Sequence, residues 1–241
     1  MLRFVAIVGL ALTAGSFAVP QPAAAAQPVV QVVTVKVTPG MLEPYRKELK
    51  KVRGVMTRLG SKATMRVWNT TLGGTDAGQV LVGLEYPDQA AWAADSGKIQ
   101  ADAEYQKIQA GLSGMRTVVS NSIWRDISPE MSSSSVAGST LVLTGVAVKP
   151  GKLEEYLKRV GSTRAINERL KIPGRARIWR AELAGTDTGA VAIGVEYPDA
   201  SAYVAAQDKL AADAEWKKLF ASLDEVRTIN GRWLYSEITP P

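Results

Sequence analysis

One sequence pattern occurs twice in this chain of 241 residues, and the two occurrences lie 111 positions apart. Residues 85–88 (Glu-Tyr-Pro-Asp) recur at 196–199, and Pro39 and Gly40 recur as Pro150 and Gly151. No insertion or deletion interrupts this offset between the matching positions. Solenoid repeats have a much shorter period of roughly 20–50 residues. We therefore expect one complete folding unit, duplicated in tandem.

Each copy is expected to hold four strands and two helical segments. Segments rich in β-branched residues predict strands, and apolar residues at helical spacing predict helices. In the first copy we expect a strand at 29–37, a helix at 41–59, a hairpin of strands at 63–72 and 79–86, a helical segment at 90–112 that breaks near Ser96 and Gly97, and a strand at 115–127. The order β-α-β-β-α-β is that of a ferredoxin-like α+β unit, whose antiparallel sheet has both helices on one face.

The two copies are expected to fold against each other. They occupy residues 29–127 and 140–239, and a Ser-rich linker joins them at 128–139. The sheet of each copy also carries apolar residues on the face without helices, and that face must be buried against another layer. Each copy can supply this layer for the other. We predict two antiparallel sheets packed face to face as a closed or nearly closed barrel, wrapped in four main helices.

The first 26 residues have the pattern of a secretory signal peptide. Arg3 gives a positive start, an apolar run covers residues 4–18, and Ala24 and Ala26 are small residues before a cleavage site. The apolar run is short for a membrane span, which needs about 20 residues. We expect a cleaved leader and a secreted or periplasmic mature protein, without stable membrane insertion. An uncleaved anchor is the alternative.

The composition excludes several classes of chemistry, because the chain contains no Cys and no His. Without Cys there is no disulfide and no thiol nucleophile. Without His there is no Ser-His-Asp triad and no His-ligated zinc or haem. We therefore expect no metal site and no cofactor. The net charge is +6, and residues 46–53 form a basic cluster without interleaved aromatic residues. This favours a solvated helix face, so we expect no nucleic-acid partner.

The hairpin of each copy predicts which side chains face the barrel interior. Alternation along a strand places Arg66 and Trp68 on the interior face, while Met65 and Val67 lie toward the helices. The pairing of the strands depends on the turn.

If the turn sets Leu72 opposite Gln79, each Trp faces a Gly, which leaves room for the indole, and each Arg faces a Glu of its own hairpin. The pairs predicted in this way are Trp68–Gly83, Arg66–Glu85, Trp179–Gly194 and Arg177–Glu196.

The interior side chains are candidates for binding a ligand. The candidate ligand-binding residues are Arg66, Trp68, Trp124, Arg177, Trp179 and Tyr235. Indole rings stack on planar molecules, and a guanidinium binds an anionic group. The alternative is that these side chains fill the barrel and fix its register. The second copy is richer in arginine, with Arg175, Arg180 and Arg232 where the first has neutral residues, so an anion site is expected in the second copy.

The repeated motifs resemble a known superfamily. Glu-Tyr-Pro-Asp is followed by Asp-Ala-Glu-Tyr at 102–105 and by Asp-Ala-Glu-Trp at 213–216. This combination is similar to the dimeric α/β-barrel superfamily, most closely to its NIPSNAP-like members and more distantly to the antibiotic-biosynthesis monooxygenases. The resemblance implies a fused pseudo-dimer that is monomeric or a weak homo-oligomer. The Glu-Trp motif is also explained by packing at a helix end.

The resemblance also suggests activities. The superfamily includes cofactor-free oxygenases of aromatic compounds, and haem enzymes that generally use a His ligand, which this chain lacks. In an oxygenase of this kind, Arg66 or Arg177 would stabilise a phenolate and Glu85 or Glu196 would accept the proton. The two carboxylates are therefore the candidate catalytic residues, although a paired Arg opposes the raised pKa that a base requires.

Three functions remain open at this point. The first is an exported barrel that binds a planar or anionic small molecule. The second is a cofactor-free, monooxygenase-like enzyme that acts on an aromatic substrate. The third is a structural or interaction protein with a packed barrel. A ligand-sized void beside the Trp and Arg side chains would favour the first two, because ligand pockets measure roughly 300–1,000 Å³.

Overall fold

The structure, a computed structural model, describes residues 27–129 and 138–240. The predicted signal peptide at 1–26 and residues 130–137 of the predicted linker lie outside the described residues. The first repeat consists of β1 (Val29–Val37), α1 (Leu42–Arg58), β2 (Thr64–Leu72), the short 3-10 helix η1 (Gly74–Asp76), β3 (Val80–Tyr86), α2 (Gln89–Ala101), α3 (Ala103–Leu112) and β4 (Arg116–Asp126).

The second repeat follows the same order. It consists of β5 (Thr140–Val148), α4 (Leu153–Gly161), α5 (Thr163–Arg169), β6 (Arg175–Leu183), η2 (Gly185–Asp187), β7 (Val191–Tyr197), α6 (Ala200–Ala212), α7 (Ala214–Leu223) and β8 (Arg227–Glu237). Two β-α-β-β-α-β repeats are therefore confirmed.

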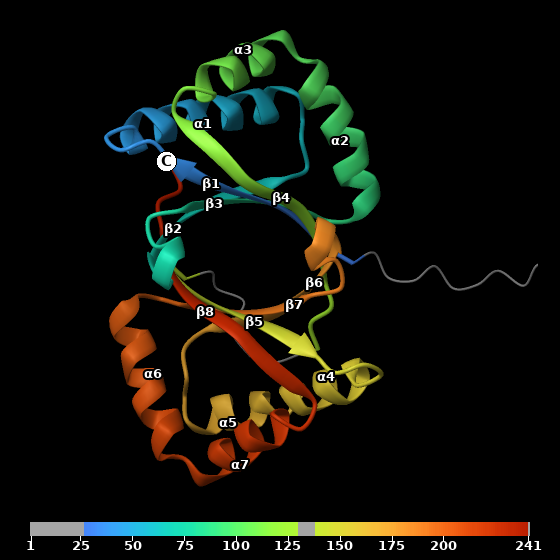
Figure 1. Ribbon diagram of the computed structural model, residues 1–241, viewed down its shortest axis with the longest axis vertical. Helices are drawn as coiled ribbons and strands as arrows, with labels where there is room; N and C mark the ends of the chain where they lie inside the picture. The colour runs from blue at the N-terminus through green and yellow to red at the C-terminus, as the bar shows by residue number, and fades with distance from the viewer. Residues whose placement is uncertain (1–26, 130–137, 241) are drawn as a thin grey trace, which may run out of the picture.

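The strands of both repeats form one closed antiparallel barrel in the order β1-β3-β2-β8-β5-β7-β6-β4. The pairs β2–β8 and β4–β6 join the two repeats, and Thr70 lies opposite Tyr235 at the first of these joins. Figure 1 shows α1 to α3 over the outer face of one sheet and α4 to α7 over the other. The predicted α+β barrel of two facing sheets is confirmed.

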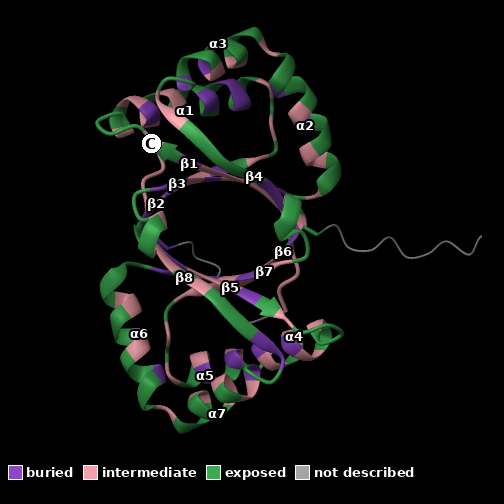
Figure 2. Cartoon of the chain, viewed as in Figure 1, coloured by how far each residue is buried: buried purple, intermediate pink, exposed green. Residues whose placement is uncertain are grey.

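The main core lies between the helices and the sheets. In the first repeat, Tyr45, Val55 and Val67 are almost fully buried there, and in the second repeat Tyr156 and Ile178 are. Figure 2 shows exposed residues over the outer faces of the helices. Within the described residues, no helix is both long and apolar enough to span a bilayer.

The break in the second helical segment lies at Asp102, and the prediction of a break near Ser96 and Gly97 was wrong. Asp102 has an extended backbone, with φ −76° and ψ 124°, and its carboxylate accepts a hydrogen bond from the backbone N–H of Tyr105. The residue thus ends α2 and caps α3. The first helical segment of the second repeat is also divided, at Ser162, so the barrel has more helices than the four predicted.

The Asp-Ala-Glu motif has the same structural role in both repeats. Asp213 caps α7 by accepting from the backbone N–H of Trp216 over 2.8 Å, and Arg169 of α5 pairs with its carboxylate over 2.8 Å. Asp102 makes the matching pair with Arg58 over 3.0 Å. The Asp of the motif therefore joins one helix end to another in both repeats, whereas the packing of the indole at a helix end stays a prediction.

The predicted register of the first hairpin was wrong by two residues. Thr70 N–H donates to Gln79 O over 2.8 Å, so the hairpin closes there and not at Leu72. The reason is the turn, because η1 lengthens the loop and Leu72 pairs with Leu234 of β8 instead. A shift of two residues leaves every side chain on its predicted face.

The pairs that follow from this register also differ from the prediction. Glycine lies opposite arginine in both hairpins, and the Trp–Gly and Arg–Glu pairs named above are not formed across either ladder. The observed pairs are Thr64–Glu85, Arg66–Gly83, Trp68–Leu81, Arg175–Glu196, Arg177–Gly194 and Trp179–Ala192.

Candidate functional site

Arg66 in the barrel interior pairs with carboxylates of the other repeat. Its Nη1 lies 2.6 Å from Glu196 Oε2 and its Nη2 lies 2.7 Å from Glu237 Oε2. Glu196 also pairs with Arg175 over 2.7 Å. The predicted Arg66–Glu85 pair was wrong, because the register places Gly83 opposite Arg66 and β2 borders β8 across the join.

The second repeat contains the equivalent arrangement. Arg177 Nη1 lies 2.8 Å from Glu85 Oε1, and Arg177 Nη2 lies 2.6 Å from Asp126 Oδ2. The predicted Arg177–Glu196 pair was therefore also wrong. Burial lowers the pKa of Arg177, but its hydrogen bond and charge interactions with Glu85 and Asp126 outweigh burial and raise it. Each arginine thus stays charged and binds the repeat to which it does not belong.

The predicted aromatic residues also face the interior. Arg66 Cζ lies 4.3 Å from the centre of the Trp68 ring, and Arg177 Cζ lies 5.2 Å from that of Trp179. Trp68 and Tyr235 are buried in one cluster, together with Leu81, Leu141, Leu143 and Trp233.

Two further contacts of the predicted aromatic residues involve small neighbours. Trp124 Nε1 donates to Ser122 Oγ over 2.8 Å. Trp179 covers Gly194 so closely that a Cβ there would lie 2.5 Å from Cζ3 of its ring, although the two are not directly paired. The six predicted residues therefore share the interior face, where the two arginines pair with carboxylates and the Trp179 Nε1–H is buried without a hydrogen-bond partner. Their role in ligand binding stays a prediction.

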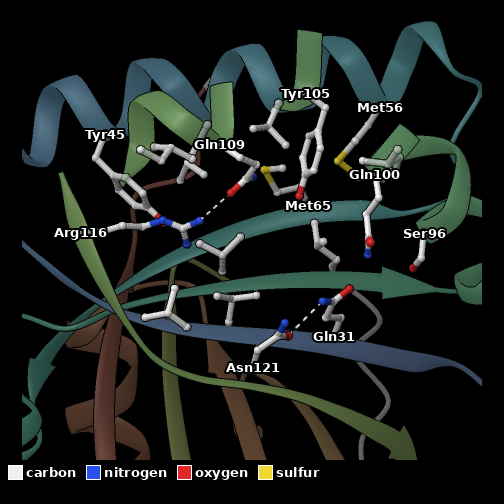
Figure 3. A pocket seen from close by; sticks show the side chains of 18 of the residues that line it. Gln31, Tyr45, Met56, Met65, Ser96, Gln100, Tyr105, Gln109, Arg116 and Asn121 are labelled. Atoms are coloured by element: carbon white, nitrogen blue, oxygen red, sulfur yellow. Dashed lines mark hydrogen bonds between the residues drawn. The ribbon is translucent and has the colours of Figure 1, made fainter. Parts of the chain in front are cut away.

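A cavity lies elsewhere, between the sheet and the helices of the first repeat. Its volume is about 380 Å³. Figure 3 shows its side chains, which come from β1 to β4 and α1 to α3. The lining includes Gln31, Val33, Tyr45, Leu49, Val52, Met56, Met65, Val82, Leu84, Tyr86, Ser96, Ile99, Gln100, Tyr105, Gln109, Leu112, Arg116, Val118 and Asn121.

Sequence reasoning missed this cavity because it assigned the outer sheet face to helix packing alone. A signal was present in Gln31, which is polar although the other outward residues of its strand are valines, and in the polar Asn121 of the neighbouring strand. The side chains of these two residues bond to each other across β1 and β4 over 2.9 Å. Trp92 Nε1 donates to Gln31 Oε1 over 3.2 Å and so holds the amide in place.

Arg116 and Tyr45 form the polar end of the cavity. Arg116 Nη2 donates to Gln109 Oε1 over 3.0 Å, and its Cζ lies 5.7 Å from the centre of the Tyr45 ring. The Tyr45 hydroxyl is buried beside the Arg116 guanidinium, and its O–H donates to no acceptor. Figure 3 shows these three side chains together at one end of the cavity. A buried O–H without an acceptor is costly, so this end of the cavity favours a ligand with an acceptor atom.

The tyrosines of the cavity are neutral phenols at physiological pH. Burial raises the pKa of Tyr45, and the charge of Arg116 only partly opposes this. Burial also raises the pKa of Tyr105, and it raises that of Tyr86 to about 12, with Asp95 adding to the effect. These groups can donate hydrogen bonds, but they are poor bases.

The second repeat has a smaller cavity at the equivalent place, of about 130 Å³. Trp216 and Phe220 occupy the positions of Tyr105 and Gln109, and their ring centres lie 5.9 Å apart. Arg232 occupies the position of Asn121 and lines this cavity. Larger side chains thus narrow the second cavity and make it more cationic.

The donor atoms of the described residues do not fit a haem or a metal ion. Haem iron in proteins is held by His, by a Cys thiolate, by Tyr, or by Met together with His, and the sequence has no His or Cys. Tyr45 would have to bind as a phenolate, which its raised pKa opposes. Among the residues that the structure describes, no group of three or more carboxylates is placed to hold a metal ion.

The sequence matches no family model and no curated protein, whereas the fold matches many solved structures. A candidate monooxygenase from Fusobacterium nucleatum superposes with a TM-score of 0.58 at 12% identity, over 88% of this chain and 92% of that one. An anthrone oxidase-like protein superposes with a TM-score of 0.59 at 15% identity, over 88% of this chain and 91% of that one. A chlorite dismutase from Candidatus Nitrospira defluvii superposes with a TM-score of 0.53 at 8% identity, over 87% of this chain and 91% of that one. At these identities the likeness shows the fold.

Proposed function

Starting from its dimeric α/β-barrel fold, we propose that this protein is an exported small-molecule-binding protein whose site is the cavity of the first repeat. The observation that carries the proposal is the volume of this cavity, about 380 Å³. That volume falls within the range of roughly 300–1,000 Å³ for ligand pockets. The walls combine apolar side chains with a few polar groups, as ligand sites do.

The chemistry of the walls supports a planar, largely apolar ligand with one polar end. Met56 and Met65 are polarizable, adaptable side chains that suit an aromatic ring. At the other side, Arg116 and the unpartnered Tyr45 hydroxyl can both donate to a carbonyl, phenolic or carboxylate oxygen. On this proposal the barrel interior is packed and has a structural role. This part agrees with the third function considered above, a structural protein with a packed barrel.

Cofactor-free oxygenation of an aromatic substrate is the second candidate. The structural likeness to a candidate monooxygenase and to an anthrone oxidase-like protein favours it. Such a reaction needs a base to deprotonate the substrate. No Asp or Glu lines the cavity among the described residues, and Glu85 and Glu196 are paired with arginines in the barrel interior. Binding without catalysis is therefore the better supported function.

Export and the monomeric state are part of the same proposal. The leader at 1–26 supports export, because its composition is that of a signal peptide. Each sheet already has its partner within the chain, which supports a monomeric pseudo-dimer. We propose no nucleic-acid partner, since the basic cluster of α1 lacks aromatic residues between its charges.

Native mass spectrometry of the protein purified from the exported fraction tests the proposal. We expect a chain that begins at Gln27, together with the extra mass of a bound molecule. A defined probe, 2-naphthoate, should quench the aromatic fluorescence saturably. Arg116→Met should weaken this binding at least tenfold, while Arg227→Met, at the equivalent position of the second repeat, should leave it unchanged.

Other results would place the ligand site elsewhere in the protein or contradict a ligand site altogether. Binding that Trp179→Ala abolishes and Arg116→Met does not would place the ligand in the barrel interior. No retained mass and no saturable quenching would leave only the packed barrel. A chain that retains Met1 would contradict leader cleavage.

A further inference from the structure

Arg227 lies in the second cavity without adequate hydrogen-bond partners. Its side chain is 3% exposed, and neither Nε nor Nη1 makes a hydrogen bond. Nη1 is 3.5 Å from Asp224 Oδ1, but the Asp224 side chain is 65% exposed and stays hydrated. A buried guanidinium in this state is costly, because two of its nitrogen atoms lose their hydration without gaining a hydrogen bond, and the single ion pair is long.

The first repeat shows what is missing. At the equivalent position, Arg116 donates to Gln109 Oε1 over 3.0 Å. Position 220 holds Phe in place of this Gln, and Arg227 Cζ lies 5.0 Å from the centre of the Phe220 ring. The ring face attracts a cation but offers no lone pair to the N–H groups. The second repeat thus lacks the Gln acceptor of the first, and the N–H groups of Arg227 are left for an acceptor from outside the chain.

The surroundings of Arg227 are cationic and apolar. Arg232 also lines the cavity, where its Nε donates to Thr144 Oγ1 over 3.2 Å. Among the described residues, neither Asp nor Glu is in the lining. The hydroxyl of Tyr156 is buried without a hydrogen-bond partner. Burial raises the pKa of this hydroxyl, and the charge of Arg227 partly opposes the rise.

We propose that this second cavity binds a small carboxylate with a short apolar body. The carboxylate accepts hydrogen bonds from the Arg227 guanidinium, which matches its planar geometry. The apolar body lies against Val146, Val160 and Leu223. A volume of about 130 Å³ suits such a molecule, since one water takes up about 30 Å³ in the liquid. The apolar walls disfavour a strongly hydrated inorganic anion.

Isothermal titration calorimetry of the full mature protein with sodium butyrate tests this site, with sodium chloride keeping the ionic strength constant. We expect saturable binding of one butyrate per chain. Arg227→Met should lower the affinity at least tenfold. Arg180→Met is the matched control and should change the affinity less than twofold, because it removes an exposed positive charge of the same repeat that lines neither cavity. 1-Butanol, which has the same chain without the charge, should bind at least tenfold more weakly.

Phe220→Gln provides a second variant that does not remove the charge. It restores the acceptor found in the first repeat and should lower the butyrate affinity, because the Gln competes for the Arg227 donors. Absence of saturable butyrate binding to the wild-type protein would overturn the proposal. Equal binding by a folded Arg227→Met variant, or equal binding of 1-butanol, would overturn it as well. If Arg227→Met does not fold, unchanged affinity in Phe220→Gln has the same consequence. The result is independent of naphthoate binding in the first cavity.

Discussion

Arg66 and Glu196 lie in different repeats, yet their side chains are joined across the barrel, with Nη1 2.6 Å from Oε2. Arg177 and Glu85 form the equivalent pair over 2.8 Å. Each repeat therefore supplies a cation to the other and receives one in return. This exchange predicts that the two repeats unfold together.

Glu196→Gln should destabilise the protein by about 3 kcal/mol, the scale observed when one partner of a buried pair is removed. Glu196 is 5% exposed and pairs with both Arg66 and Arg175. Without its charge Arg175 would lose this carboxylate and Arg66 would keep Glu237 alone. The measurement is urea unfolding followed by far-UV circular dichroism. Glu168→Gln is the control, because it removes an exposed pair within α5 and should cost about 0.5 kcal/mol or less. Equal effects would contradict the importance of the crossed pairs.

Stability should fall when the pH drops below the ordinary range of glutamate titration. Burial raises the pKa of Glu237, but hydrogen bonds from Arg66 and Thr239 outweigh burial and lower it below its ordinary value. The unfolded chain then binds more protons than the folded chain between the two pKa values, so this contribution is present at neutral pH and is lost as the pH falls through the folded pKa. Urea midpoints between pH 7 and pH 3 should fall less steeply in Glu237→Gln.

Gly194→Ala should destabilise the protein by about 1–3 kcal/mol through overpacking. A Cβ at this position would lie 2.5 Å from Trp179 Cζ3 and 3.1 Å from Leu141 Cδ1. The matched control is Gly83→Ala in the first repeat, where the nearest atom would be 3.8 Å away. Thermal unfolding of the two variants provides the comparison. A larger loss of thermal stability in Gly83→Ala than in Gly194→Ala would show that the contact with Trp179 does not determine the cost of the substitution.

Asp213→Ala should lower the urea midpoint more than Asp213→Asn does. The pKa of Asp213 is lowered to about 2, first by its hydrogen bond with Arg169 and then by that with the Trp216 backbone N–H. Asn keeps a side-chain oxygen for the helix cap, whereas Ala loses both the cap and the link to Arg169. Hydrogen exchange of the first turn of α7 should increase in Asp213→Ala. Unchanged exchange there would argue against the cap.

The repeat made the topology predictable, because a duplicated β-α-β-β-α-β unit with one uncovered sheet face has few ways to bury that face. The face of each strand residue was also predictable, since alternation survives a two-residue shift. The register of the hairpin could not be predicted, because it depends on the length of the turn at η1 and not on the residues that flank the turn.

The site was harder to predict than the fold. The sequence led to Arg66, Trp68 and their counterparts, which do share the interior, but it paired each arginine within its own hairpin. The cavities depend on how far the helices stand from the sheet, and no local pattern encodes that distance. Arg227 drew no attention in the sequence, because its state follows from the absence of an acceptor at Phe220.

The fusion of the two repeats has a consequence for specialisation. In a symmetric homodimer every substitution appears twice, so both cavities change together. In a single chain, position 109 can remain Gln while position 220 is Phe, and the two chambers can acquire separate chemistries on one framework. The crossed arginine pairs hold that framework constant. One molecule can in this way present a larger compartment with one arginine and a smaller one with two, each open to change without the other.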